Sequence, residues 1–257
     1  MSYQFYTVEI AEFIATVTIN RPPVNAQNGP MREELITIFE TLGELDEVRA
    51  IILTANGRVF SAGADIKERV GIAAGAGDYA RNNRIVRNFF DVVADCPKPV
   101  IAAVNGPMIG AGFVLALCCD IMIAAETASF QMPEVNVGLA GGTAFISEHF
   151  GRSRARAMYL TGRTYPASEL YRLGVAEAVV PSERLLEEAM VYAREIAAKS
   201  PLAIQAAKQG FINVKEMPVR DAYRYEQTLT VALSKTEDAK EAQRAFVEKR
   251  APEFKSR

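Results

Sequence analysis

The chain has 257 residues, of which 49% are apolar and 23% are charged, and its formal net charge is −2. This composition is typical of a folded globular protein with one large domain, or one domain with an appended subdomain, and it excludes a disordered chain. A charge so near to neutral gives no general attraction to nucleic acid or to an anionic membrane. We therefore expect neither as a partner, and a phosphate-bearing ligand would need a local site.

The counts of cysteine and histidine exclude several kinds of site. The three cysteines, Cys96, Cys118 and Cys119, form no CxxC motif, so we expect no disulfide framework and a cytoplasmic location. The single histidine, His149, excludes an HExxH motif, and no GxSxG motif accompanies it. We therefore expect His149 to be a structural helix residue, and we expect no metal. The start of the sequence lacks the features of a signal peptide, and the longest apolar stretch, residues 110–123, is too short to cross a bilayer.

Apolar periodicity predicts alternating strands and helices up to about residue 140. In chain order we expect a hairpin over residues 7–20 that turns at Ala11-Glu12, a helix over 30–45, a strand over 50–55, a helix over 79–94, a strand over 100–104, a helix from 110 to about 118 and a strand over 121–125. The short apolar runs are typical of strands that are buried on both faces of a sheet. From about residue 143 onward the pattern is almost wholly helical.

This order of elements predicts an α/β fold with a core over residues 1–195 and a C-terminal helical subdomain over residues 196–257. No repeat, low-complexity segment or flexible linker interrupts the chain. The C-terminal helices mix apolar stripes with many charges, which leaves two interpretations open. They form either a solvated amphipathic face that packs on the chain's own core or an oligomer contact.

Two loops rich in small residues follow buried strands, at residues 60–68 (FSAGADIKE) and 105–112 (NGPMIGAG). Small residues let the backbone approach a ligand closely, and the start of a helix offers N–H groups that have no helical partner. Two such groups converging on one oxygen would form an oxyanion hole. The alternative is a tight strand-to-helix turn without a ligand. A dinucleotide site is excluded because Leu115 stands where GxGxxG requires its third glycine.

Glu134 is a candidate general base because it follows a short predicted strand and precedes a glycine turn at residues 138–142. The alternative is a surface glutamate beside a turn.

These segments, in this order, resemble the crotonase superfamily, which is also called the enoyl-CoA hydratase/isomerase family. The matching pieces are Arg21-Pro22 with Asn25-Ala26, FSAGADIKE, KPVIAAVNG, IGAGF with the following LAL and CD, ASFQMPE with GGT, LTGR at 160–163, LGVAEAVVP at 173–181 and the terminal AFVEKRAPEFKSR. The resemblance covers essentially the whole chain. It implies a spiral of ββα units with a C-terminal helical region that assembles a homotrimer or a dimer of trimers.

The resemblance also implies a set of site residues and a substrate class. The oxyanion N–H groups would belong to Ala64 and Ala111, and the catalytic carboxylate to Glu134. The substrate would be an acyl-CoA thioester, with coenzyme A as its only cofactor-like part and no prosthetic group. The residues that would contact coenzyme A are Asn25, Ala26, Ala62, Ala64, Asp65, Ile66, Lys67 and, at the C-terminal end, Lys249.

The sequence departs from the hydratase pattern at Val114, where that pattern has its first catalytic glutamate. The glycine turn after Glu134 is also shorter than the usual pattern by about three residues. A single carboxylate suffices to move a proton between two carbons, so we expect an enoyl-CoA isomerase with Glu134 as proton shuttle.

Three alternatives remain open. The first is a hydratase of an unusual enoyl-CoA, in which Glu148, Asp65 or Glu126 replaces the missing acid or the backbone alone holds the water. The others are an acyl-CoA decarboxylase or hydrolase, and a non-catalytic acyl-CoA-binding protein. Candidates to line an apolar acyl pocket are Phe113, Val114, Phe145 and Phe211, and each of them would otherwise be a core residue.

Overall fold

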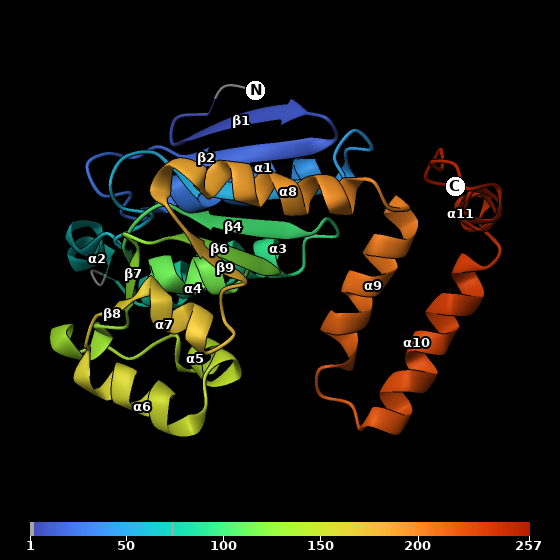
Figure 1. Cartoon of the computed structure of the whole chain (residues 1–257). Helices are drawn as coiled ribbons and strands as arrows, with labels where there is room; N and C mark the ends of the chain where they lie inside the picture. The colour runs from blue at the N-terminus through green and yellow to red at the C-terminus, as the bar shows by residue number, and fades with distance from the viewer. Residues whose placement is uncertain (1–2, 73–74) are drawn as a thin grey trace.

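The computed structural model describes residues 3–72 and 75–257 (Figure 1). Its main sheet has six strands in the order β1-β2-β3-β4-β6-β9. The strands are β1 (Tyr6–Ala11), β2 (Ile14–Ile19), β3 (Ala50–Ala55), β4 (Val100–Val104), β6 (Ile121–Ala125) and β9 (Ala178–Val180). β1 and β2 are antiparallel, and every other neighbouring pair is parallel.

The expected hairpin and the three buried strands are therefore confirmed. The hairpin turns at Glu12 and Phe13, one residue later than expected, and both have a positive φ, of 53° and 63°. The expectation of an almost wholly helical pattern after residue 143 missed β9, which pairs with β6. Three residues are too few for periodicity to separate a strand from a loop.

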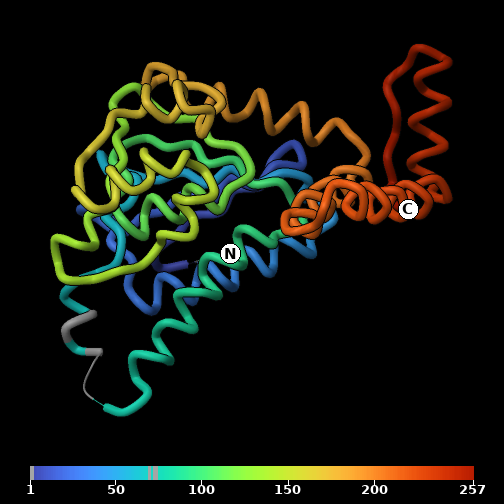
Figure 2. Tube along the Cα trace, turned by 90° about the horizontal axis from the view of Figure 1, so that it is seen from below, coloured from blue at the N-terminus to red at the C-terminus, as the bar shows by residue number. Residues whose placement is uncertain are grey.

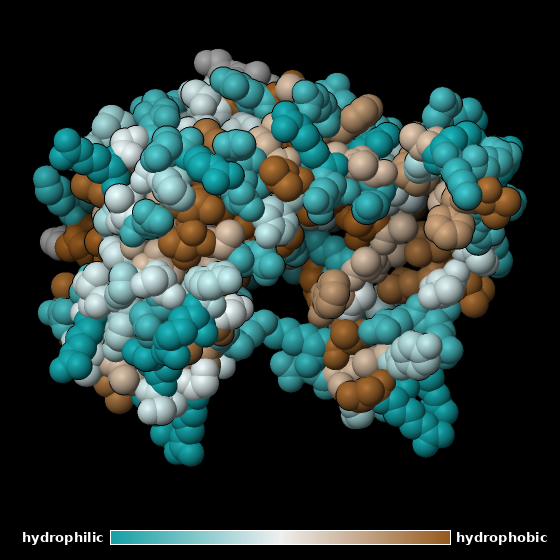
Figure 3. Space-filling view, in the orientation of Figure 1, coloured by the Kyte–Doolittle hydropathy of each residue, from teal (hydrophilic) through white to brown (hydrophobic). Residues whose placement is uncertain are grey.

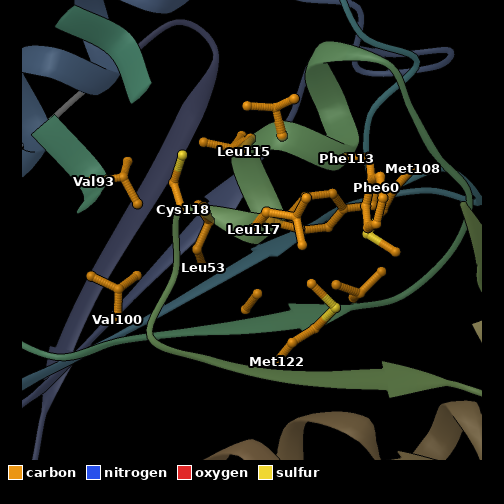
Figure 4. Packing of buried hydrophobic residues seen from close by; sticks show 14 of the residues in the cluster. Leu53, Phe60, Val93, Val100, Met108, Phe113, Leu115, Leu117, Cys118 and Met122 are labelled. Carbon is orange, nitrogen blue, oxygen red and sulfur yellow. The ribbon is translucent and has the colours of Figure 1, made fainter. Parts of the chain in front are cut away.

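Apolar side chains bury both faces of the sheet. Helices α1 (Gly29–Glu44), α3 (Asp78–Ala94) and α4 (Ala111–Leu117) share one core with one face of the strands. Figure 4 shows Leu117 of α4 close to Leu53 of β3 among the buried side chains of that face. On the other face, α8 (Leu185–Ala197) packs on Ile52 and its neighbours. Burying each large apolar side chain stabilises the fold by roughly 1.5–3 kcal/mol.

A second sheet connects the loops that follow β4 and β6. Its strands are β5 (Met108–Ile109), β7 (Ser129–Gln131) and β8 (Tyr165–Pro166), in the order β5-β7-β8. The shorter elements around it are α2 (Ile66–Ile72), α5 (Thr143–His149), α6 (Arg152–Thr161), α7 (Ala167–Arg172) and the 3-10 helices η1 (Glu134–Val137) and η2 (Ser182–Arg184). Because β5 and β7 pair, the loop before α4 lies beside the start of η1.

The last three helices are α9 (Pro201–Val214), α10 (Val219–Leu233) and α11 (Glu237–Glu248), and they extend away from the sheet (Figures 1 and 2). An ion pair of the buried Lys208 connects α9 to the core, with Lys208 Nζ 2.7 Å from Asp120 Oδ2. The expected α/β core followed by C-terminal helices is confirmed, whereas the division at residues 195 and 196 stays a prediction. Within the described ranges, no helix is both long enough and apolar enough to span a membrane.

Candidate active site

The two small-residue loops are hydrogen-bonded to each other along their length. The Phe60 N–H donates to the Pro107 carbonyl at 3.1 Å, and the Ile109 N–H donates to the Ser61 carbonyl at 3.0 Å. Ser61 and Met108 also form an isolated parallel β-bridge. Loops that follow different strands are therefore held side by side at one edge of the sheet.

Gly63 is one of the points at which these loops approach each other closely. Its φ is +80°, and a β-carbon there would lie 2.4 Å from the Ile109 carbonyl oxygen and 3.2 Å from the Ala111 nitrogen. Only glycine fits such a contact. The backbone of residues 63–64 consequently lies against the first residue of α4.

Ala64 and Ala111 line one cavity and have N–H groups available to a ligand. Among the described residues, neither N–H donates a hydrogen bond to the protein. For Ala111 this follows from its place at the start of α4, where helical N–H groups lack helical acceptors. The structure thus places in one cavity the two groups that the family resemblance implied as oxyanion donors.

The cavity has a volume of about 510 Å³ and is mostly apolar. Its walls come from the two loops, from one face of α3, from η1 and from the segment between η1 and α5. The lining residues are Arg32, Ala62, Gly63, Ala64, Asp65, Ile66, Glu68, Tyr79, Asn82, Asn83, Val86, Arg87, Phe90, Ile109, Gly110, Ala111, Val114, Pro133, Glu134, Asn136, Val137, Leu139, Ala140, Gly141, Gly142 and Phe145.

Glu134 begins η1 and is half-buried in this cavity. Its Oε1 atom lies next to Gly110, where an added β-carbon would come within 2.5 Å of it. Since Gly110 directly precedes Ala111, the carboxylate lies beside one of the two candidate oxyanion N–H groups. The main-chain carbonyl of Glu134 accepts a hydrogen bond from the Leu139 N–H at 2.9 Å, which fixes the backbone around it.

The other two carboxylates that line the described cavity, Asp65 and Glu68, are both engaged elsewhere. Asp65 forms an ion pair with Arg21 at 2.8 Å. Partial burial raises the pKa of Asp65, but hydrogen bonds from Arg21 and from backbone N–H groups outweigh it, so the pKa lies below its ordinary value. Glu68 accepts the Gly29 N–H at 2.9 and 3.0 Å.

Of the three acids considered as replacements for the missing glutamate, only Asp65 lines the cavity. Glu148 is 42% exposed and pairs with Lys215 at 2.5 Å. Glu126 is exposed just after β6. These two expectations are wrong, because neither residue is part of the cavity wall.

Val114 stands in the cavity wall on α4, 2% exposed, and Phe145 lies opposite on α5. The other two pocket candidates do not line the cavity: Phe113 is the core residue that the alternative expected, and Phe211 is neither a pocket residue nor a core residue. Phe113 is fully buried against Phe130, with ring centroids 4.9 Å apart, because it faces the core side of α4. Phe211 is 81% exposed on α9, away from the cavity.

The residues expected to meet coenzyme A form a short backbone ladder beside the cavity. The Ala62 N–H donates to Val24 at 2.9 Å, and the Gln27 N–H donates to Gly63 at 2.7 Å. Of the expected set, Ala62, Ala64, Asp65 and Ile66 line the cavity, whereas Asn25, Ala26 and Lys67 lie next to it. The Asn25 side chain is buried and donates to the Asn56 and Val59 carbonyls, so it fixes the loop rather than facing a ligand.

Lys249 is separated from the other expected ligand-binding residues. It follows α11, which both Figure 1 and Figure 2 place at the opposite end of the molecule from α2. Within one chain Lys249 is not part of the cavity wall.

One wall of the cavity was not predicted. Tyr79, Asn82, Asn83, Val86, Arg87 and Phe90 of α3 line it, at the spacing of one helical face. That spacing is visible in the sequence, but mixed polar and apolar residues gave no signal for a ligand site. His149 lies outside the wall and its Nδ1 is 2.8 Å from the Phe145 carbonyl, in agreement with a structural role.

Comparisons with known proteins agree over the whole chain. A family model described as "Enoyl-CoA hydratase/isomerase" matches residues 9–257. The chain is 38% identical to a probable enoyl-CoA hydratase of Rhizobium meliloti (strain 1021), over 100% of both proteins. It is 36% identical to the 2,3-dehydroadipyl-CoA hydratase of Escherichia coli (strain K12), over 95% of this chain and 96% of that protein.

A solved structure gives the same picture of the fold. The crystal structure of an enoyl-CoA hydratase from Bacillus anthracis is 33% identical and has a TM-score of 0.93, covering 99% of this chain and 100% of that chain. This likeness confirms the α/β fold class with a C-terminal helical part.

Proposed function

Because the chain belongs to the enoyl-CoA hydratase/isomerase family and is therefore an acyl-CoA enzyme, we propose that it moves the double bond of an enoyl-CoA. Glu134 is the single proton shuttle. The observation that supports this most strongly is the makeup of the cavity wall. Glu134 lies beside the Ala111 end of α4, whereas the nearby wall position on that helix is the apolar Val114.

In the proposed reaction, the thioester oxygen of a 3-enoyl-CoA accepts hydrogen bonds from the Ala64 and Ala111 N–H groups. The Glu134 carboxylate removes a proton from C2, and the electron pair spreads onto the thioester oxygen as a dienolate. The same carboxyl group then returns the proton to C4, so the double bond moves to C2–C3 and no atom is gained or lost. Each oxyanion donor of this kind stabilises the transition state by about 2.7–4 kcal/mol.

Hydration would require a water held and activated beside the same substrate carbon. Valine at residue 114 has no group that orients water or transfers a proton. A positioned acid or base is worth roughly 10²–10⁴-fold in rate. We therefore infer that migration of the double bond is faster than addition of water.

The coenzyme A part of the substrate is proposed to run along residues 25–26 and 62–66, with Lys67 near its phosphates.

We also propose that the chain assembles as a homotrimer or a dimer of trimers, in which a neighbour's Lys249 approaches the site. Large apolar side chains on the C-terminal helices support this, since Phe211 is 81% exposed and Val219 and Phe246 are both 86% exposed. Figure 3 shows hydrophobic side chains gathered over this part of the surface.

The test is to incubate the purified protein separately with cis-3-enoyl-CoA and trans-2-enoyl-CoA of one chain length and to separate the products by chromatography. The proposal expects trans-2-enoyl-CoA from the first substrate and little 3-hydroxyacyl-CoA from either. Rapid formation of 3-hydroxyacyl-CoA from trans-2-enoyl-CoA would contradict it.

Hydration is the second candidate, and the names of the relatives favour it. The relatives from Rhizobium meliloti and Escherichia coli are both called hydratases. For this chain, hydration would require the cavity to hold a water without a carboxylate at residue 114. The same product separation distinguishes the two candidates.

A further inference from the structure

A buried tyrosine fixes the backbone of the segment between η1 and α5. Tyr159 is 5% exposed on α6, and its ring belongs to the main core. Its hydroxyl accepts a hydrogen bond from the Gly141 N–H at 2.6 Å and donates one to the Gly141 carbonyl at 2.9 Å. One side chain from α6 is therefore hydrogen-bonded to both backbone polar groups of Gly141.

This segment forms a cavity wall beside the candidate base. One end of it is tied to Glu134 through the Leu139 N–H, and the other end is Gly142, which precedes α5 with a φ of +80°. A β-carbon at Gly142 would lie 3.1 Å from Val114 Cγ2 and 2.7 Å from Met132 Cε. The backbone of the segment therefore rests directly on Val114, and Tyr159 holds it there from behind.

Three glycines within residues 138–142 would leave this wall with many backbone conformations if nothing restrained it, because glycine has the largest backbone freedom of any residue. The Tyr159 hydroxyl accepts one hydrogen bond from Gly141 and donates another to it. Two hydrogen bonds to one residue restrict both the rotation and the translation of its peptide groups. A buried hydroxyl that loses such partners is left unsatisfied, so the bonded arrangement is strongly favoured. The Tyr159 hydroxyl thus restrains the glycine-rich end of the wall, whereas the Leu139 N–H ties the other end to Glu134.

We propose that Tyr159 is a positioning residue that determines acyl specificity. By holding Gly141, it keeps the segment against Val114 and fixes the width of the cavity beside Glu134. An acyl chain longer or wider than this space would require the segment to move and would break the two Tyr159 hydrogen bonds. The inference rests on the proposed role of Glu134, but it holds whether the enzyme moves a double bond or adds water.

The variant that tests this is Tyr159→Phe, which removes the hydroxyl and keeps the buried ring. The readout is kcat and KM for hexenoyl-CoA and decenoyl-CoA, in whichever reaction the wild-type enzyme catalyses. We expect kcat for hexenoyl-CoA to fall by about tenfold, since two hydrogen bonds that hold the wall are lost. We also expect the preference for hexenoyl-CoA over decenoyl-CoA, as a ratio of kcat/KM, to fall by about tenfold.

The matched control is Tyr192→Phe, which removes a hydroxyl from α8 on the opposite face of the sheet. It should leave both kcat and the chain-length ratio at wild-type values. If Tyr159→Phe unfolds, Gly142→Ala disturbs the same wall from the cavity side and should lower the same ratio.

The outcomes separate this inference from the proposed function. An active wild-type enzyme whose chain-length ratio is unchanged in Tyr159→Phe overturns the inference and leaves the proposed function intact. Equal losses for both substrates, accompanied by a lower Tm, indicate a purely structural tyrosine and also overturn it. A wild-type enzyme that acts on neither substrate contradicts the proposed function, and the inference falls with it.

Discussion

Glu134 Oε1 lies so close to the backbone of Gly110 that a β-carbon at residue 110 would come within 2.5 Å of it. Gly110 has φ 52° and ψ −119°, a conformation that other residues rarely adopt. The hydrogen bond from its N–H to the Gln131 carbonyl, at 2.9 Å, ties it to the strand that leads to Glu134. The absence of a side chain at this position therefore leaves room for the carboxylate beside the Ala111 N–H.

Gly110→Ala should displace this carboxylate. We expect kcat to fall by about 10²-fold, the usual effect of misplacing a catalytic group by about 1 Å. Gly57→Ala is a matched control, because Gly57 also has a positive φ, +85°, but a β-carbon there would meet nothing within 4 Å. The two variants should lose similar stability in thermal unfolding. Equal kcat values for both would show that the carboxylate does not depend on Gly110.

A second prediction concerns the residue that replaces the expected glutamate. Val114→Glu would place another carboxylate in the cavity wall, and a nearby like charge raises the pKa of Glu134. A base must be ionised to act, so the pH at half-maximal rate should rise and turnover near neutral pH should fall by about tenfold or more. Val114→Gln has the same size without the charge and should keep the wild-type midpoint. Identical pH–rate profiles for the two variants would contradict the proximity of residue 114 to Glu134.

Much of this site was predictable from the sequence, because its parts are local. Strands 50–55 and 100–104 were predicted to the residue, since burial on both faces makes them continuous apolar runs. The small residues placed just after those strands indicated two candidate ligand loops, and the family resemblance assigned the backbone donors to Ala64 and Ala111. A site that lies at the ends of adjacent strands can be predicted from sequence without knowing the contacts between distant segments.

The features that were missed depend on contacts between distant segments. Phe211 has the helical spacing of a core residue, yet α9 extends away from the sheet and leaves it exposed. Tyr159 gives no local signal, since its partner Gly141 lies 18 residues away on another element. Similarly, nothing in the periodicity of α3 indicates which of its faces borders a cavity.

A third prediction concerns the ion pair that holds the C-terminal helices. Lys208 is 5% exposed, and its Nζ donates to both Asp120 and the Lys98 carbonyl. Lys208→Met should lower the free energy of unfolding by about 1–3 kcal/mol, because the Lys98 carbonyl and the Asp120 carboxylate lose the charged donor that connects α9 to the core. Directly after the same helix, Lys215→Met removes a solvent-exposed pair with Glu148 and should change that free energy by less than about 0.5 kcal/mol. Denaturant unfolding measures both, and equal losses would contradict this account.

A fourth prediction concerns pH and the C-terminal residues. Hydrogen bonds from Arg250 and then Arg244, with a further one from the Glu253 N–H, hold the pKa of Glu241 well below its ordinary value. A depressed carboxyl pKa stabilises the folded form at every pH above the unfolded value of about 4.3. That contribution is lost as the pH falls from there through the folded pKa.

Amide hydrogen exchange, corrected for its intrinsic pH dependence, measures this effect. Protection of the residues that follow α11 should be constant between neutral pH and about pH 5 and should decline below about pH 4. Glu241→Gln should show low protection throughout. Protection that is unchanged in acid would show that this carboxylate does not hold the C-terminal segment.

The central claim, that one carboxylate moves a proton between two carbons, is tested most directly by mass spectrometry of the products formed from cis-3-enoyl-CoA in heavy water. The wild-type enzyme should give trans-2-enoyl-CoA that carries at most deuterium at carbon and no added heavy water. Glu134→Gln should slow this product by at least about 10²-fold while binding coenzyme A with nearly unchanged affinity. A product whose mass has increased by one molecule of heavy water, or a Glu134→Gln variant as fast as wild type, would contradict the account.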